Sequence, residues 1–121
     1  MNNLTDAEWN IMNLLWATPA LTMTQLTQAL FPSTNWSKHT VMTYLKRMEV
    51  KGFIRFEEGV KAKQYYPILL KEDAILTEKN LLLQKAFKGN SGLMFSTLLE
   101  HDTLTESEID QLMQLLESKK S

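Results

Sequence analysis

The first predicted helix is marked by its cap and by the spacing of its apolar residues. Thr5 and Glu8 have the spacing of a capping box, in which each side chain hydrogen-bonds to the backbone N–H of the other residue. Apolar residues then recur on one side of the helix, and Pro19 limits its extent, so we expect it to end near Ala17. The residues predicted to face the core are Ile11, Met12, Leu15 and Trp16.

A second capping box at Thr22 and Gln25 predicts another helix directly afterwards. This helix is expected to be short and to end near Leu30, because Phe31-Pro32 follows. Residues 33–35 are polar and are predicted to form the loop into a third helix.

The third predicted helix begins after Ser37, a favourable N-cap, and has one apolar and one polar face. Val41, Leu45, Met48 and Gly52 fall on the apolar side, which we expect to face the core. The opposite side carries mostly cations and hydroxyls, the groups that contact phosphate oxygens and base edges. The candidate DNA-binding residues of this helix are Ser37, Lys38, His39, Thr40, Met42, Thr43, Lys46 and Arg47.

A β-hairpin is predicted directly after this helix. Residues 52–56 favour a strand, 57–59 a turn and 61–66 a returning strand, and Pro67 ends the sheet. Lys61 and Lys63 lie near the hairpin tip and are candidate phosphate contacts. This order of elements is typical of a winged helix-turn-helix whose third helix enters the major groove. A solvated helix face beside an ordinary hairpin remains an alternative.

The remaining chain predicts three short amphipathic helices, over 71–87, from Ser91 and from a third capping box at Thr105 and Glu108. Their apolar faces are too extensive for so small a segment to bury, which favours burial against a second copy. Folding back onto the winged helix as a monomer is the alternative. The candidate dimerisation residues are Leu82, Leu83, Phe87, Leu93, Phe95, Leu98, Ile109, Leu112, Met113 and Leu116.

These patterns predict a mainly α fold with a small β-hairpin wing. Residues 1–70 would form a winged helix-turn-helix DNA-binding domain, and 71–121 a helical dimerisation region. The net charge of −1 hides an asymmetry, because all seven cations of residues 1–70 lie between Lys38 and Lys63. A concentrated basic patch attracts a polyanion even when the whole chain is nearly neutral.

Composition also excludes several classes of protein. The 121 residues contain no cysteine, so disulfides and thiolate metal sites are impossible. No long apolar run and no signal-peptide pattern occurs, so we expect a cytoplasmic protein without membrane insertion. His101 and Asp102 lie beside Glu100, but this cluster is a weak metal or acid–base candidate. No catalytic motif is present, so we expect neither an enzyme nor a cofactor.

Several motifs together resemble the penicillinase-repressor family, the BlaI, MecI and CopY type. The similarity covers nearly the whole chain in order and spacing. The motifs that carry it are Ala7-Glu8-Trp9, Trp36-Ser37, Thr40-Val41, Thr43, Leu45, Arg47, Lys51-Gly52-Phe53-Ile54, Tyr65-Tyr66-Pro67, Leu104-Thr105 and Glu108-Ile109.

The resemblance implies a homodimeric transcriptional repressor that binds a palindromic DNA operator. It implies DNA contacts at Ser37, Thr40, Thr43 and Arg47, supported by Lys61 or Lys63. Two positions depart from the family pattern, because His39 and Met42 stand where relatives often carry cations. We therefore expect a different operator preference. A protein-interaction module without specific DNA binding is the alternative function.

The resemblance also raises two modes of release from DNA. Copper-sensing relatives use cysteine pairs, which this chain lacks. Relatives in antibiotic resistance are inactivated when a sensor-linked protease signal leads to C-terminal cleavage. The corresponding position here is Thr97–Leu98, where the family's Asn-Phe pair is missing. Release by proteolysis at this position and release by another mechanism are therefore alternatives.

Overall fold

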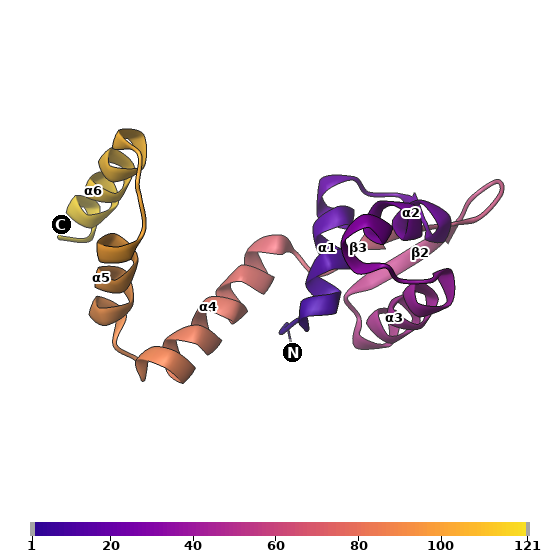
Figure 1. Ribbon diagram of the computed structural model, residues 1–121, viewed down its shortest axis with the longest axis horizontal. Coiled ribbons are helices and arrows are strands. Elements are labelled where there is room, and N and C mark those ends of the chain that lie inside the picture. The colour runs from indigo at the N-terminus through magenta and orange to yellow at the C-terminus, as the bar shows by residue number, and fades with distance from the viewer. Residues whose placement is uncertain (1, 121) are drawn as a thin grey trace. The chain divides into compact units, whose positions relative to one another are not determined.

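The computed structural model of the protein describes residues 2–120. Within this range the chain forms six helices and one three-stranded antiparallel sheet, which confirms the predicted mainly α fold with a small wing (Figure 1). In chain order the elements are α1 (Asp6–Ala17), β1 (Leu21–Thr22), α2 (Met23–Thr34), α3 (Lys38–Lys51), β2 (Ile54–Glu58), β3 (Lys63–Pro67), α4 (Lys71–Phe87), α5 (Ser91–His101) and α6 (Glu106–Lys120).

The chain divides into two compact units, Met1–Lys79 and Asn80–Ser121. The boundary falls inside α4, because the start of this helix packs into the first unit through Ala74, which is 1% exposed. The predicted functional division into 1–70 and 71–121 stays a prediction.

The predicted helix starts are confirmed, with one shift. The Thr5 hydroxyl accepts the Glu8 backbone N–H at 3.2 Å, and the Glu8 carboxylate accepts the Thr5 N–H at 2.8 Å. The same reciprocal bonds form at the other two capping boxes. The start of α5 is the exception, since Asn90 and not Ser91 is the cap and its side chain accepts the Leu93 N–H at 3.0 Å.

The predicted end of the second helix near Leu30 is wrong. Helix α2 continues through Pro32 to Thr34 and ends at Asn35, which adopts the left-handed conformation with φ of 59°. The Ser33 and Thr34 hydroxyls both donate to the Leu30 carbonyl, at 3.3 and 2.8 Å. These bonds give a carbonyl near the end of the helix two side-chain donors. The connection to α3 is therefore only residues 35–37, a tight helix-turn-helix turn.

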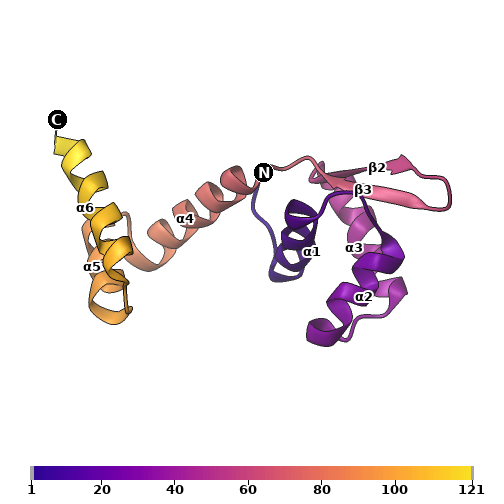
Figure 2. The same ribbon diagram turned by 90° about the horizontal axis from the view of Figure 1, so that it is seen from above.

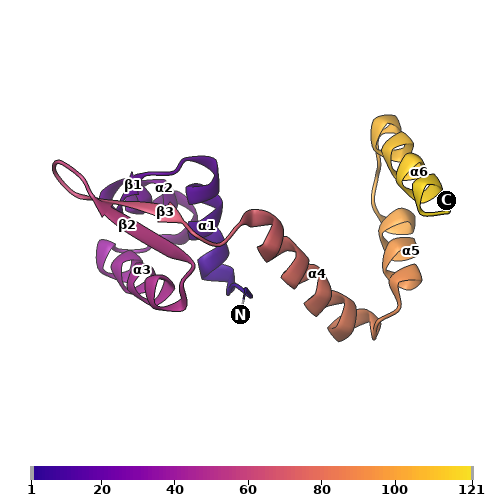
Figure 3. The same cartoon turned by 180° about the vertical axis from the view of Figure 1, so that it is seen from behind.

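The sheet contains a strand that the sequence pattern did not predict. Strand β1 pairs with β3, so the strand order is β1-β3-β2, and Figure 3 shows β1 beside β3. Ala20, with φ of 74°, turns the chain after Pro19 and donates its N–H to the Tyr65 carbonyl at 3.0 Å. Two residues are too few to show the alternation that identifies a strand.

The hairpin itself is confirmed with shifted limits. Strand β2 begins at Ile54, because Gly52 ends α3 in the left-handed conformation with φ of 81°. Gly52 is exposed, so its expected place on the core side is wrong. Strands β2 and β3 pair in antiparallel register from Ile54 opposite Pro67 to Glu58 opposite Lys63.

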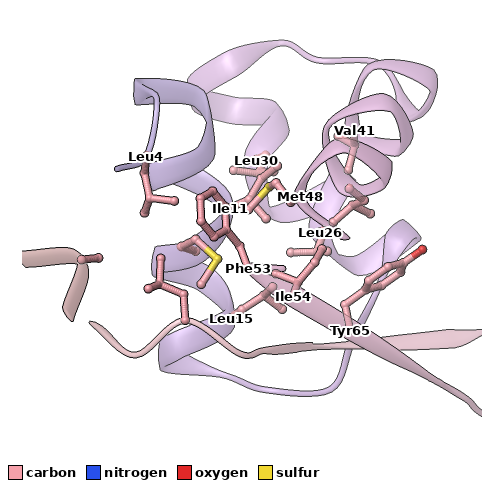
Figure 4. Packing of buried hydrophobic residues seen from close by; sticks show 14 residues of the cluster. Leu4, Ile11, Leu15, Leu26, Leu30, Val41, Met48, Phe53, Ile54 and Tyr65 are labelled. Atoms are coloured by element: carbon pink, nitrogen blue, oxygen red, sulfur yellow. The ribbon is translucent and has the colours of Figure 1, made fainter. Parts of the chain in front are cut away.

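The core of the first unit lies between the three helices and the sheet (Figure 4). Helix α1 contributes Ile11, Met12 and Leu15, which are all fully buried, as the sequence pattern predicts. The predicted inward position of Trp16 is also supported, since it packs on the core and its indole N–H donates to the Leu69 carbonyl at 2.9 Å. This bond joins α1 to the segment that leads into α4.

Candidate nucleic-acid interface

Helix α3 is held against the core by one face, which leaves the opposite face available for a ligand. Val41, Leu45 and Met48 are 0% exposed, as predicted. Ser37 caps the helix by accepting the Thr40 N–H at 3.2 Å, and the rings of Trp36 and Tyr44 pack beside this end at a centroid distance of 4.9 Å. The predicted polar residues therefore lie on a rigid, capped helix. Figure 2 shows α3 beside α2, with the β2–β3 hairpin extending past both helices.

The hydroxyls on this face are already partly committed to each other and to the backbone. The oxygens of Ser37 and Thr40 are 3.1 Å apart and share one hydrogen bond. The Thr43 hydroxyl donates to the backbone carbonyl of His39 at 3.1 Å. These contacts restrict which groups each side chain can offer to a ligand.

The basic patch separates into paired and unpaired cations. Lys51 lies 2.6 Å from Glu8, and Arg55 lies 2.6 Å from Glu57. The other five cations between Lys38 and Lys63 form no ion pair within residues 2–120. These five are Lys38, Lys46, Arg47, Lys61 and Lys63. The cations that form no ion pair within the described range are therefore the five that the sequence pattern selects as candidate DNA contacts.

The wing presents two of these cations from a short loop and a strand. Its turn is closed by a hydrogen bond from the Gly59 N–H to the Ala62 carbonyl at 3.0 Å, and Lys61 lies exposed between them. Lys63 places its ammonium 4.1 Å from the centroid of the Phe56 ring, a favourable cation–π distance. The ring centroid of Phe56 in turn lies 6.2 Å from that of Tyr65, which is buried in the core.

Lys51 belongs to the basic run of the sequence but has a structural role. The Glu8 side chain is 3% exposed and Lys51 is its charged partner, so this pair joins the start of α1 to the end of α3. Burial raises the pKa of Glu8, but hydrogen bonds from Lys51 and Thr5 and the Lys51 charge outweigh it, so the pKa lies below its ordinary value of 4.5. No local sequence signal predicts this pairing, because the residues are 43 positions apart.

Arg55 also has a carboxylate partner and is not one of the five unpaired cations. Its guanidinium stacks 4.4 Å from the Tyr66 ring centroid while its Nη1 contacts Glu57. Arg55 and Tyr66 are directly opposite in the β2–β3 register, which explains the stack.

The predicted dimerisation residues are not buried within the described chain. Neither α5 nor α6 contains a buried residue, and α4 contains only Ala74. Leu83, Phe87 and Leu112 are half-buried. The exposed members are Leu82, Leu93, Phe95, Leu98, Ile109, Met113 and Leu116.

The other candidates from the C-terminal part are placed as follows. Thr97 and Leu98 lie within α5, where the Thr97 hydroxyl donates to the Leu93 carbonyl at 2.7 Å. His101 is exposed at the end of α5, and no group of three or more possible metal ligands occurs among the residues that the structure describes. Over the same residues, no helix has the length and apolarity required to cross a membrane.

The tight turn between α2 and α3, followed by the β2–β3 hairpin, defines a winged helix-turn-helix protein. Residues 4–118 match the model of the penicillinase repressor family. The chain belongs to this family, as its motifs predicted.

Two relatives that match over nearly their whole length agree with this assignment, and a solved structure shares the fold. The methicillin resistance regulatory protein MecI of Mammaliicoccus sciuri is 26% identical over 116 residues, covering 96% of this chain and 94% of MecI. The penicillinase repressor of Bacillus licheniformis is 27% identical over 118 residues, covering 98% and 92% of the two chains. The DNA-binding domain of the repressor BlaI shares the fold with a TM-score of 0.53 and 24% identity, covering 58% of this chain and 85% of that domain.

Proposed function

We propose that this protein is a homodimeric transcriptional repressor that binds a palindromic DNA operator through α3 and the wing. The most direct support is that the outward side of α3 and the wing carry five cations that have no carboxylate partner among residues 2–120. Helix α3 would read base edges in the major groove while the wing contacts phosphates. The proposed DNA-binding residues are Ser37, Lys38, His39, Thr40, Met42, Thr43, Lys46, Arg47, Lys61 and Lys63.

Within this set, Arg47 is the strongest candidate for reading a base. Its guanidinium is exposed and unpaired within the described chain, and a bidentate contact to guanine discriminates by about 1–3 kcal/mol. Lys61 and Lys63 are suited to phosphate, because an ammonium is a point charge without the planar geometry that matches a base edge.

Dimerisation is supported by the apolar side chains that the single chain leaves exposed. Phe95 is 57% exposed and Leu98 is 48% exposed, although both lie in a regular helix. Burying such faces against a second copy removes them from water and places two α3 helices on two half-sites. We assign this role to residues 71–121 and DNA binding to residues 1–70.

The family also suggests how the repressor is released. A cut between Thr97 and Leu98 would divide α5 and separate α6 from the rest of the dimerisation region. Because both residues lie within a helix, a sensor-linked protease could cut there only after α5 opens locally. Regulation of antibiotic resistance in the cytoplasm is the setting suggested by the curated relatives.

DNA binding is tested with purified full-length protein and duplex DNA from the region upstream of its own gene. A scrambled duplex is the control, and both are titrated at two salt concentrations. Retention tighter than on scrambled DNA by about a thousandfold or more supports a sequence-specific repressor. Equal, salt-sensitive binding to both duplexes would leave only a basic patch. No binding at all would favour a protein-interaction module.

A further inference from the structure

The Thr43 side chain lies on the exposed side of α3 but has no hydroxyl hydrogen left to donate. Its one hydrogen is directed to the His39 carbonyl, four residues earlier, at 3.1 Å. Phosphate oxygens and the acceptor atoms of guanine and thymine all require a donor. Thr43 therefore cannot serve any of them while this bond is kept.

The first turn of α3 behaves differently. The Ser37 and Thr40 oxygens are 3.1 Å apart, so one hydroxyl donates to the other. The second hydroxyl hydrogen of the pair forms no hydrogen bond within residues 2–120. At a helix N-terminus, where backbone N–H groups favour anions, this hydrogen is available to a phosphate. Ser37 and Thr40 thus keep one hydroxyl hydrogen between them for a ligand, whereas Thr43 keeps none.

Thr43 still offers DNA its methyl group and the acceptor lone pairs of its oxygen. Met42 precedes it in the sequence, is also partly exposed, and adds a second apolar side chain to the same region of the helix. In the major groove, apolar groups distinguish thymine through its C5-methyl group. We propose that the Thr43 methyl group contacts the C5-methyl of one thymine in each half-site, which makes Thr43 a specificity-determining residue.

This inference rests on the proposed DNA-binding function and deepens it. It assigns a base to a residue whose hydroxyl chemistry otherwise suggests phosphate. The alternative is that the Thr43 oxygen accepts a hydrogen bond from adenine or cytosine. A methyl contact and an oxygen contact predict different effects of substituting Thr43. The two are separated by variants that keep either the methyl group or the oxygen.

The test uses full-length protein and a duplex selected by it from a random-sequence pool. Each thymine of one half-site is replaced in turn by deoxyuridine, which removes only the C5-methyl group. One replacement is expected to weaken binding about fourfold, equivalent to ~0.8 kcal/mol for one buried methyl group. Thr43→Ser, which keeps the hydroxyl and loses the methyl, is expected to weaken binding by the same factor and to be insensitive to that replacement.

Thr43→Val keeps a methyl group and lacks the oxygen, so it is expected to bind within about twofold of the wild type and to keep the deoxyuridine effect. Thr40→Val is the matched control, because it is expected to weaken all duplexes equally and leave the deoxyuridine effect intact. Circular dichroism confirms that each variant folds.

Three results would overturn the assignment to thymine. Deoxyuridine could have no effect at any position, the Thr43→Ser variant could keep the full effect, or Thr43→Val could lose binding, which would assign the contact to the oxygen. In all three, a specific duplex is still selected and the repressor proposal stands. Failure to select any sequence would instead refute the proposed function and this inference with it.

Discussion

Two tryptophans on α1 provide a matched test of how the fold is held together. The rings of Trp9 and Trp16 meet edge to face at a centroid distance of 5.7 Å and an interplanar angle of 70°. The Trp16 N–H donates to the Leu69 carbonyl at 2.9 Å, whereas the Trp9 N–H is buried without a partner in the described structure. Replacing each with phenylalanine removes the same atoms from two half-buried rings on one helix.

Losing the indole N–H is expected to lower the stability of one variant and to raise that of the other. Trp16→Phe breaks a hydrogen bond and leaves the carbonyl of the buried Leu69 unsatisfied, which costs about 1–3 kcal/mol. Trp9→Phe removes an unsatisfied donor, so a similar desolvation penalty is relieved. The loss of ring area is common to both. We therefore expect Trp16→Phe to be less stable than Trp9→Phe by about 2 kcal/mol or more.

Urea unfolding followed by far-ultraviolet circular dichroism measures this difference. All proteins are compared at one concentration, because the stability of a dimer depends on it. With a typical denaturant slope of about 2 kcal/mol/M, the two midpoints should differ by about 1 M. Equal urea midpoints for the two variants would refute the reasoning, since they would show that the bonded Trp16 N–H and the unbonded Trp9 N–H contribute equally to stability.

Three further predictions concern charge, DNA and assembly. Because the pKa of Glu8 is lowered on folding, the stability that Glu8 contributes is complete above pH 4.5 and is lost as the pH falls through the folded-state pKa. Lys51→Met should lower the free energy of unfolding by about 1–3 kcal/mol at neutral pH and reduce this loss of stability in acid. Urea midpoints of the wild type that do not change with pH would contradict the prediction. Arg47→Ala should weaken operator binding by about 1–3 kcal/mol with little loss on scrambled DNA, and equal losses on the two duplexes would exclude a base-reading role for Arg47. Lys61→Ala should weaken binding to both duplexes and reduce the salt dependence of the binding constant by about one phosphate contact. If the proposed dimer forms through α5, Leu98→Asp should give a folded monomer in light scattering, and a variant that stays dimeric would place the interface elsewhere.

Sequence reasoning identified the elements that depend on near neighbours in the chain. The capping boxes at Thr5 and Thr22 and the N-cap at Ser37 could be predicted because their hydrogen bonds span three residues. The apolar face of α3 was equally accessible, since helical periodicity alone places Val41 and Leu45 together. The DNA-binding role assigned to the opposite face stays a prediction.

The predictions that were wrong concern the C-terminal ends of α2 and α3. Pro32 was expected to terminate α2, but the Thr34 hydroxyl and the left-handed Asn35 complete the helix beyond it. Gly52 fits the helical spacing of the core face but ends the helix instead. In both cases the hydrogen bonds and backbone conformation of the last turn decided where the helix ends.

The sequence by itself determined the order of the helices, the caps at Thr5, Thr22 and Ser37, the basic face and the family. Tertiary structure decided which charges are free, because Lys51 meets Glu8 only when residues 43 positions apart come together. It also decided the Trp16–Leu69 bond across 53 positions and the pairing of β1 with β3. The physical reason is range: helix caps and periodic faces are set by neighbours along the chain, whereas ion pairs, sheet edges and buried donors depend on which distant segments pack together.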